Sequence, residues 1–267
     1  MGRNRISQQD RREQKSKRRL DGHDSSVGKE KFQEDRLEKA KSKEIKPMNK
    51  KQDGYLKALN DPDISVIIAT GYAGSSKSFC ATAHACLEFL NNRVYKIAFS
   101  RPAISNSKSL GYFAGGKDEK MAIWLAPVLN TVKQFLGSAA TEIAIKNEDI
   151  IFYPLEVIKG LSLGSVVDGK RMYFIVDEAE DLTIDEVKKI VTRIGKNCTL
   201  VLAGDLTQSE LKQSSGLKWL VEFYQRHNLK GFYHVDFNDV NDIVRSNTVK
   251  EFIVALKRDE KVRINEN

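Results

Sequence analysis

Short apolar runs alternate with amphipathic stretches from residue 64 onward, and this alternation constrains the fold more than any other feature. The runs are typical of buried strands and cover Ser65–Thr70, Val94–Ser100, Asp149–Tyr153, Met172–Val176, Cys198–Ala203 and Gly231–Val235. The stretches of helical pattern cover Lys77–Leu90, Lys117–Leu136, Ile184–Arg193, Gly216–Arg226 and Asp239–Arg258. Continuous apolar strands separated by helices predict an α/β fold with a parallel sheet sandwiched by helices. Ligands of such sheets bind at the carboxyl ends of the strands.

The N-terminal fifth has a different composition. Few large apolar side chains occur before Pro47, so this segment cannot offset its ordering entropy by burial. We expect residues 1–46 to be a basic, largely disordered arm with a transient helix around Lys29–Lys43. Residues 47–267 are expected to form one domain.

The net charge of +8 lies entirely within the first 57 residues. Its densest cluster is Arg11, Arg12, Lys15, Lys17, Arg18 and Arg19. Such a cluster is suited to the phosphate backbone of a nucleic acid, although a solvated tail that aids solubility has the same composition. The cluster contains no aromatic side chain, so we expect backbone contacts rather than base stacking.

Composition also argues against several classes of protein. No apolar run reaches the ~18 residues that a membrane span requires, and no apolar stretch follows the basic N-terminus as in a secretory signal. Three cysteines without close pairing argue against a disulfide framework. We therefore expect a cytoplasmic protein that does not bind membranes.

The segment between the first strand and the first helix has the pattern of a phosphate-binding loop. It reads Gly71-Tyr72-Ala73-Gly74-Ser75-Ser76-Lys77-Ser78. Glycines let backbone N–H groups surround phosphate oxygens, and the helix N-terminus adds favourable partial charge. Lys77 is expected to neutralise the β- and γ-phosphates of ATP, and Ser78 to offer a hydroxyl to Mg²⁺. Ser76 stands where the pattern has glycine, and would be strained by ~1 kcal/mol or more if that position needs positive φ.

Polar residues follow two later strands. Asp177 and Glu178 end the strand at Met172–Val176, which suits Asp177 to Mg²⁺ binding and Glu178 to activating a water. Gln208 follows the next strand and could sense the γ-phosphate or position water. A solvated acidic turn and an ordinary Gly-Asp loop are the alternative interpretations.

Four further residues are candidates for nucleotide contacts. Gln52 has the donor and acceptor that the adenine edge requires, and Tyr55 could stack on the base. Arg245 and Arg193 are candidates for stabilising transition-state charge, with Arg245 favoured. A surface amide and structural salt bridges are the alternatives.

Together these motifs resemble the PhoH family of phosphate-starvation-type ATPases from bacteria and their phages, over about Asn49–Lys257. The motifs that carry the resemblance are Asn49-x-x-Gln52 with Tyr55, the phosphate loop, Ser100-Arg101-Pro102, Leu110–Phe113, Gly115–Lys117, Asp177–Ala179, Thr192–Gly195, Gly204-Asp205-x-x-Gln208, Ser215–Leu217 and Asp242-x-Val244-Arg245. The sequence departs from the family pattern at Tyr72, Ser75, Ser76 and Ser78, and at Glu180, which stands in the place of a glutamine.

The resemblance implies a P-loop NTPase with a single RecA-like domain, similar to the motor core of superfamily 1 helicases. It also implies ATPase activity linked to RNA and, for some members, hexameric rings, in which Arg245 or Arg193 could act on a neighbouring subunit. The leading hypothesis is an ATP-driven motor on RNA or single-stranded nucleic acid. The segment Arg101–Lys120 could line the polymer path, and an ordinary long loop is the alternative interpretation. The alternatives are a nucleotide-gated nucleic-acid-binding ring with little turnover and, more weakly, a small-molecule kinase.

Overall fold

The computed structural model describes residues 43–102, 117–164, 169–211 and 214–265. The expectations for the arm up to residue 42, and for the segment 103–116, lie outside these residues. Within them the chain forms a six-stranded sheet in the order β3-β2-β4-β5-β1-β6, and every pairing is parallel. The strands are β1 (Val66–Gly71), β2 (Val94–Ser100), β3 (Ile150–Phe152), β4 (Arg171–Val176), β5 (Cys198–Gly204) and β6 (Phe232–Phe237).

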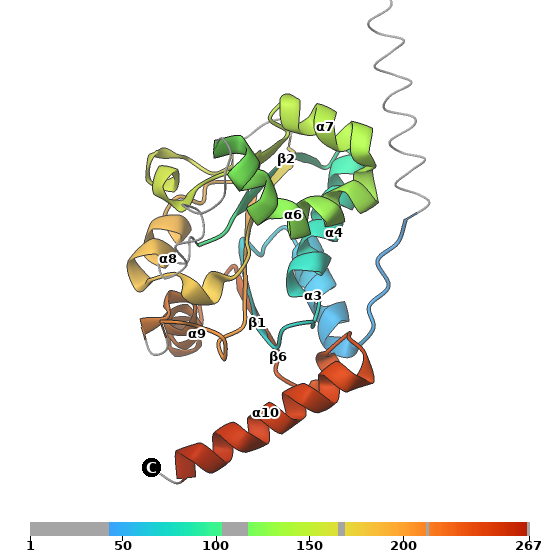
Figure 1. Ribbon diagram of the computed structural model, residues 1–267. Coiled ribbons are helices and arrows are strands. Elements are labelled where there is room, and N and C mark those ends of the chain that lie inside the picture. Colours follow the sequence, from blue (N-terminus) through green and yellow to red (C-terminus); the bar gives the residue numbers. More distant parts are fainter. Residues whose placement is uncertain (1–42, 103–116, 165–168, 212–213, 266–267) are drawn as a thin grey trace, which may run out of the picture. The chain divides into compact units, whose positions relative to one another are not determined.

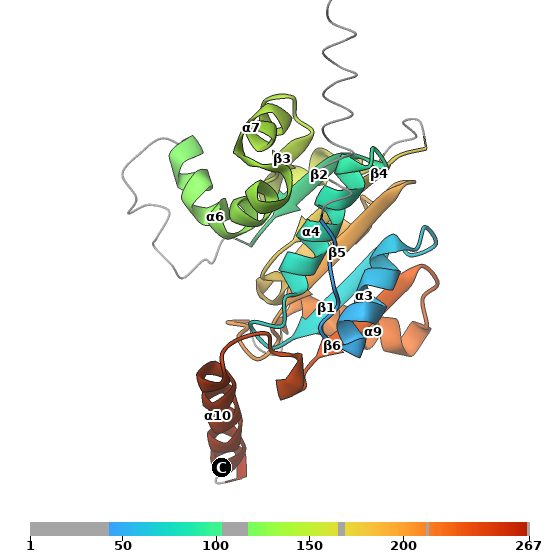
Figure 2. The ribbon, with the colours of Figure 1, turned by 90° about the vertical axis from the view of Figure 1, so that its right-hand side faces the viewer.

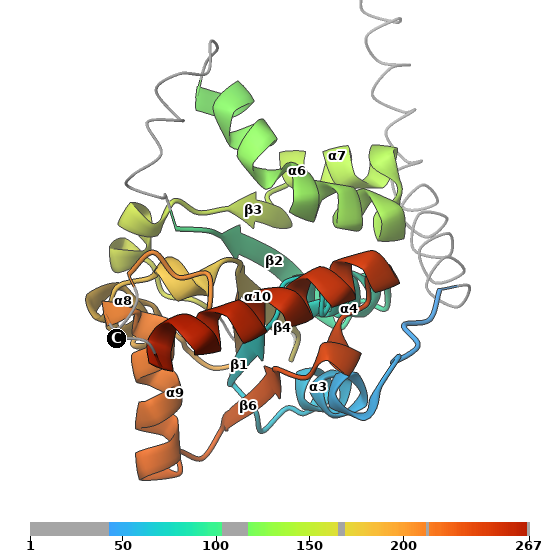
Figure 3. The same cartoon turned by 60° about the horizontal axis from the view of Figure 1, so that its bottom comes forward.

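Helices cover both faces of the sheet, as the alternating pattern predicts (Figures 1 and 2). One face carries α3 (Lys50–Asn60), α4 (Lys77–Leu90), α6 (Lys117–Leu136) and α7 (Ser138–Lys146). The other carries α8 (Ile184–Val191), α9 (Gly216–His227) and the short 3₁₀ helix η2 (Leu155–Gly160). Figure 3 shows β3 at one edge of the sheet, beside α7, and β6 at the other edge.

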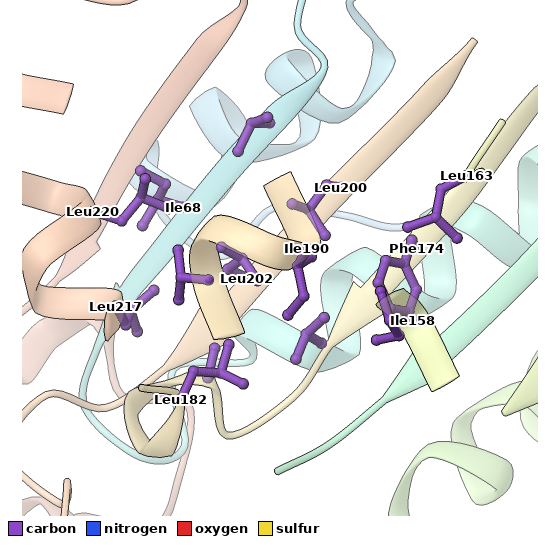
Figure 4. Packing of buried hydrophobic residues seen from close by; sticks show 14 of the residues in the cluster. Ile68, Ile158, Leu163, Phe174, Leu182, Ile190, Leu200, Leu202, Leu217 and Leu220 are labelled. Atoms are coloured by element: carbon purple, nitrogen blue, oxygen red, sulfur yellow. The ribbon is translucent and has the colours of Figure 1, made fainter. Parts of the chain in front are cut away.

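Side chains that alternate along the strands build the core beneath α8 and α9 (Figure 4). Ile68 of β1, Phe174 of β4 and Leu202 of β5 point to this face and are fully buried. Ile190 of α8 and Leu217 of α9 pack against them. Burying each such side chain contributes about 1.5–3 kcal/mol, so this cluster fixes the strand register that brings the strand ends together.

The structure corrects the sequence-based boundaries at the C-terminus. The sequence predicts a single helix over Asp239–Arg258, but the chain forms a 3₁₀ turn, η5 (Val240–Asp242), and begins α10 only at Asn247. Ile243 is extended, and the Val244 N–H donates to the Gly74 carbonyl at 2.8 Å. This bond to the phosphate loop requires extended backbone, which interrupts the helical pattern.

Two helices, α3 and α7, have no counterpart among the elements predicted from the sequence. The side chain of Asn49 caps α3 by accepting from the Gln52 N–H at 2.8 Å. The last helix, α10 (Asn247–Asn265), exposes Val249, Phe252 and Leu256 in its first half. No helix in the described part of the chain is long and apolar enough to cross a membrane.

Candidate functional site

The carboxyl ends of β1, β4 and β5 meet around a cavity of about 540 Å³. Most residues that the sequence predicts to act on nucleotide line it: Ala73, Gly74, Ser76, Lys77, Ser78, Asp177, Glu178, Gln208 and Arg245. Glu180, Gly204 and Asp205 complete much of the remaining wall. Residues far apart in the sequence therefore converge because parallel strands end at one edge of the sheet.

The loop between β1 and α4 depends on glycine at two positions. Gly71 has φ of 120°, and a Cβ there would lie 2.3 Å from the backbone of Phe237 at the end of β6. Gly74 has φ of 83°, and a Cβ there would lie 2.6 Å from Cγ of Arg245. Side chains at these positions would push the loop away from its neighbours, so the loop keeps this shape only with glycine.

Ser76 adopts the left-handed conformation, with φ of 65° and ψ of 24°, immediately before α4. This position therefore has the positive φ at which a residue other than glycine is strained, and serine is strained there by about 1 kcal/mol. The Ser76 side chain makes no capping hydrogen bond to the helix and lines the cavity. The departure from glycine thus has a conformational cost at the site itself.

The Lys77 ammonium lies within the loop. Its Nζ donates to the Gly71 carbonyl at 2.6 Å and the Tyr72 carbonyl at 2.9 Å, and the side chain is 8% exposed. Burial lowers the pKa of Lys77, while nearby carboxylates, Asp205 first among them, act in the opposite direction. The cation is therefore held by loop carbonyls next to the cavity, where an anion can compete for it.

Ser78 and Asp177 form a hydroxyl–carboxylate pair in the wall of the cavity, with Ser78 Oγ donating to Asp177 Oδ1. The N–H of Asp177 donates to the Ser100 carbonyl at 3.0 Å, which fixes the tip of β4. No group of three or more metal-ligating His, Cys, Asp or Glu side chains occurs among the described residues. One hydroxyl and one carboxylate oxygen fit Mg²⁺, which takes few protein ligands and completes its shell with water and phosphate oxygens.

Glu178 follows Asp177 in the left-handed conformation, with φ of 53°. Its carboxylate is bound by Arg101, whose Nε donates to Glu178 Oε2 at 2.7 Å and whose second nitrogen contacts Oε1. The Arg101 and Glu178 side chains are 20% and 34% exposed, respectively. A two-point contact of this kind fixes the plane of the carboxylate.

Asp205 connects the end of β5 to the phosphate loop. Its Oδ2 accepts from the Ala73 N–H at 2.9 Å and from Gln208 Nε2 at 2.8 Å, and its side chain is buried. Its Oδ1 accepts from the backbone and hydroxyl of Thr207. Gln208 is therefore held at the cavity by the carboxylate of Asp205, to which the sequence assigns no individual role.

Arg245 reaches the cavity of its own chain, because Val244 is bonded to Gly74 and the next side chain then lies beside the loop. Asp242, which is buried, anchors this segment through a 2.7 Å ion pair with Lys51 of α3. Arg193 lies elsewhere: it is exposed, and it does not line the cavity. The two arginines thus occupy different positions relative to the site.

The expectation that Tyr55 stacks on a base is wrong for this structure. Its ring is fully buried against Phe237, with ring centroids 5.9 Å apart, and its hydroxyl donates to the Lys77 carbonyl at 3.2 Å. Burial raises the pKa of this phenol well above its usual value. Tyr55 therefore supports the start of α4 from below and presents no face to the cavity.

Gln52 is likewise buried and absent from the cavity wall. Its amide accepts from the Met48 N–H at 2.9 Å, and its Nε2 lies 3.4 Å from the Ser75 carbonyl. Gln52 thus contacts the back of the loop. Ser75 is also buried, with its hydroxyl bonded to the Tyr72 carbonyl at 2.8 Å.

Three residues at the site, Arg101, Glu180 and Asp205, have no individual role predicted from the sequence. Arg101 and Asp205 belong to short motifs after β2 and β5, and their position directly beyond an apolar strand is the available signal. Glu180 is buried inside an acidic run whose neighbours Asp181 and Glu178 are more exposed. Sequence alone gives no sign of which carboxylate turns inward.

A parallel sheet with a glycine-dependent loop, a loop lysine and a serine–aspartate pair at its carboxyl edge defines a P-loop nucleoside-triphosphatase. The family model described as PhoH-like protein matches residues 44–257. The chain belongs to the PhoH family, and its family and fold together support a nucleotide-binding ATPase.

Two curated relatives illustrate the similarity. The chain is 28% identical over 226 residues to the PhoH-like protein of Bacillus subtilis (strain 168), an alignment that covers 84% of this chain and 67% of the relative. It is 29% identical over 187 residues to Protein PhoH of Escherichia coli (strain K12), which covers 68% of this chain and 51% of the relative. The chain therefore spans between about half and two thirds of the length of these relatives.

The large terminase of a thermophilic bacteriophage is a similar solved structure, with a TM-score of 0.46 and 12% identity over 78% of this chain and 50% of that chain. The fold assignment rests on the strand order and the phosphate loop, and not on this alignment.

Proposed function

We propose that the chain binds ATP with Mg²⁺ in the cavity at the ends of β1, β4 and β5 and hydrolyses it. The observation that carries this proposal is the convergence of Lys77, Ser78 and the Asp177–Glu178 pair on one cavity. The roles follow from their chemistry. Backbone N–H groups of the loop and of the first turn of α4 surround the phosphates, and Lys77 neutralises them.

Ser78 and Asp177 would hold Mg²⁺, which supplies charge neutralisation to the phosphate oxygens. Glu178 accepts a proton from the attacking water, and Gln208, fixed by Asp205, orients that water or the γ-phosphate. Arg245 contacts the phosphates of the nucleotide bound to its own subunit, because it lines the same cavity.

We propose that the protein uses ATP hydrolysis to act on RNA or another single-stranded nucleic acid. The support is electrostatic: the entire charge excess of +8 lies in the first 57 residues, with six cations between Arg11 and Arg19. Each phosphate contact that such a cluster makes adds to the salt dependence of binding.

A homo-oligomer, in the form of a ring, is proposed as the working assembly. Arg193 is exposed and away from the cavity of its own chain, so it is available to the nucleotide of a neighbour. The exposed apolar side chains of α10, Val249, Phe252 and Leu256, suit a contact between subunits.

The decisive experiment measures ATP binding and hydrolysis with and without single-stranded RNA. Wild type is compared with Lys77→Ala, with Glu178→Gln, and with Lys146→Ala as a control, since Lys146 is exposed at the end of α7. We expect RNA-stimulated turnover in wild type and the control, loss of binding in Lys77→Ala, and binding without turnover in Glu178→Gln. Wild-type turnover no higher than that of Lys77→Ala would refute hydrolysis.

Replacing the six cations between Arg11 and Arg19 by glutamine tests the polymer. The slope of log affinity for RNA against log salt should fall by about 0.7 for each phosphate that the arm no longer binds. An unchanged slope would show that these six cations do not bind RNA phosphates. Mixing Arg193→Ala with Lys77→Ala protein tests the ring, because activity returns in the mixture only if Arg193 acts on a neighbour.

A second candidate function is a nucleotide-gated nucleic-acid-binding ring with little turnover. The strained serine at position 76, with φ of 65°, is the observation that favours it, because this residue faces the cavity. The same experiment separates the two functions: ATP binding that depends on RNA, with no turnover above that of Glu178→Gln, supports the second.

A further inference from the structure

Phe79 is an exposed aromatic side chain in a cavity whose other walls are mostly polar. It follows Ser78 in the first turn of α4, lines the cavity and is 37% exposed. Of the large apolar side chains exposed in the described part of the chain, it is the one that lines this cavity. A single apolar side chain on an open surface is common, but an aromatic ring inside a polar binding cavity offers a flat face to a ligand.

Phe79 points to a different side of α4 from the proposed metal ligands. Ser78 faces Asp177 at the end of β4, because its hydroxyl donates to that carboxylate. Successive side chains of an α-helix point about 100° apart, so Phe79 turns away from this pair. Its ring packs against Phe135 of α6, with ring centroids 6.0 Å apart and ring planes inclined by 59°. Phe135 is itself buried and does not line the cavity, so it supports the Phe79 ring from outside.

The two residues that the sequence assigns to the nucleobase are turned away from the cavity. Tyr55 is fully buried, with its hydroxyl bonded to the Lys77 carbonyl. Gln52 is also buried, and both ends of its amide are used. Its Oε1 accepts from the Met48 N–H at 2.9 Å, and its Nε2 lies 3.4 Å from the Ser75 carbonyl. Neither the predicted stacking ring nor the predicted amide is therefore placed to contact a base in this cavity.

Given the proposed function, on which this step rests, we infer that the nucleobase stacks on Phe79. The loop and Lys77 bind the phosphates, and Phe79 lies two residues further along the chain, clear of the Ser78–Asp177 pair. Stacking needs only the flat face that every base has, so it adds affinity without reading the edge of the base. A purine has the larger face and buries more of it. The substrate class is therefore nucleoside triphosphates in general, with purines bound more tightly than pyrimidines.

The first test compares Mg²⁺-ATP with Mg²⁺-tripolyphosphate, because both carry a triphosphate and only ATP carries a base. Affinities are measured for wild type, Phe79→Ala, Phe79→Tyr and a control, Phe223→Ala. Phe223 is a partly exposed phenylalanine of α9 that packs on Trp219, with ring centroids 5.0 Å apart, and does not line the cavity.

Phe79→Ala should weaken the binding of ATP by about tenfold, the lower end of what one stacked base contributes, and leave the affinity for tripolyphosphate unchanged. Phe79→Tyr keeps the ring and should bind both ligands as wild type does, and so should Phe223→Ala. Equal losses for the two ligands in Phe79→Ala would overturn the inference, since Phe79 would then only support the loop. Unchanged affinity for ATP would overturn it as well.

Lys77→Ala distinguishes failure of this inference from failure of the proposed function, because Lys77 is proposed to bind the phosphates that both ligands share. If Lys77→Ala weakens neither ligand, the proposed function fails, and the role of Phe79 fails with it. If Lys77→Ala weakens both ligands while Phe79→Ala weakens neither, only the stacking fails.

A second measurement needs no variant, and so decides the matter even if Phe79→Ala does not fold. Wild-type affinities are compared for the triphosphates of adenosine, inosine, guanosine, cytidine and uridine. Stacking predicts that the three purines bind within about threefold of one another and more tightly than the two pyrimidines. A site that hydrogen-bonds the adenine edge can reject a purine lacking the right group by a factor of about 10⁴. Preference for ATP over inosine triphosphate by about a hundredfold or more, or pyrimidines bound as tightly as purines, would overturn the inference.

Discussion

Arg101 holds the carboxylate of Glu178 through both of its oxygens, with Nε 2.7 Å from Oε2. Glu178 is the proposed acceptor of the water proton, so this contact decides which way that acceptor faces. Because a planar guanidinium fixes a carboxylate at two points, Arg101 is a positioning residue for Glu178.

Arg101→Ala should therefore lower turnover of ATP by about tenfold while leaving the affinity for nucleotide unchanged, since a carboxylate that is free to rotate loses the productive geometry. Arg101→Lys keeps the charge but not the fork and should fall between wild type and Arg101→Ala. Steady-state kinetics with separate binding measurements check this. Faster turnover in Arg101→Ala would show that the pair restrains Glu178 instead of orienting it.

Ser76 is held at φ of 65°, where glycine costs less. Ser76→Gly should raise the free energy of unfolding by roughly 0–1 kcal/mol, the relief of left-handed strain minus the greater freedom of glycine in the unfolded chain. Turnover should rise with it, because the side chain is removed from the cavity wall. Chemical denaturation and ATPase assays give the two quantities.

A matched control is Asn92→Gly, at another left-handed position with φ of 61° outside the cavity. Asparagine tolerates this conformation better than serine, so the gain in stability should be smaller, and turnover should not change. Equal changes in turnover for both variants would show that the Ser76 side chain has no specific effect on ATP hydrolysis.

His84 gives the stability of the fold a defined pH dependence. Burial lowers the pKa of its imidazole from 6.5 to about 4, and the ring contacts the hydroxyl of Tyr173 at 3.2 Å. The unfolded chain takes up a proton at higher pH than the folded one does, so this contribution is complete above about pH 6.5 and is lost as pH falls towards 4.

Between those values His84 should remove up to roughly 3 kcal/mol from the free energy of unfolding. Denaturant titrations of wild type, His84→Gln and the exposed His227→Gln check this. We expect a shallower acid slope only in His84→Gln. The same slope in all three proteins would mean that the buried imidazole is not the group that titrates.

The alternation of apolar runs predicts the parallel sheet because each strand is buried on both faces, and β5 is buried along its whole length. The observed strand boundaries differ from the predicted ones by at most two residues. By contrast, α3 is largely polar and begins at an asparagine cap, so its sequence does not show the apolar pattern by which other helices are predicted. Local pattern is informative where burial is continuous and much less so where a helix is held by caps and by contacts distant in sequence.

At the site, spacing correctly predicts that Lys77, Ser78 and Asp177 come together, because parallel strand ends must meet. It misplaces Tyr55, since a tyrosine before a phosphate loop can lie either beneath the loop or over its ligand. Its burial beside Phe237 depends on β6, more than 170 residues later in the chain. The position of Arg245 at the cavity of its own chain likewise depends on the hydrogen bond between Val244 and Gly74, which no sequence pattern specifies.

Gly74 and Arg245 are coupled by direct packing, because a Cβ at position 74 would lie 2.6 Å from Arg245 Cγ. Gly74→Ala should therefore lower the free energy of unfolding by about 1–2 kcal/mol, because alanine is strained at positive φ. It should also displace Arg245 from the cavity wall, which lowers the free energy of unfolding further. Gly137→Ala isolates the first contribution, since Gly137 has φ of 85° and a Cβ there would have nothing within 4 Å. Gly160→Ala, with neither feature, should be close to neutral.

In an Arg245→Ala background the collision is absent, so Gly74→Ala should cost no more than Gly137→Ala. The difference between the two backgrounds should be a coupling of about 1 kcal/mol or more in the free energy of unfolding. Nucleotide affinity should follow the same pattern, with Gly74→Ala and Arg245→Ala each weakening binding and the double variant weakening it by less than the sum. Strict additivity in both measurements would show that the loop and Arg245 act independently, and that the close contact does not determine where this arginine points.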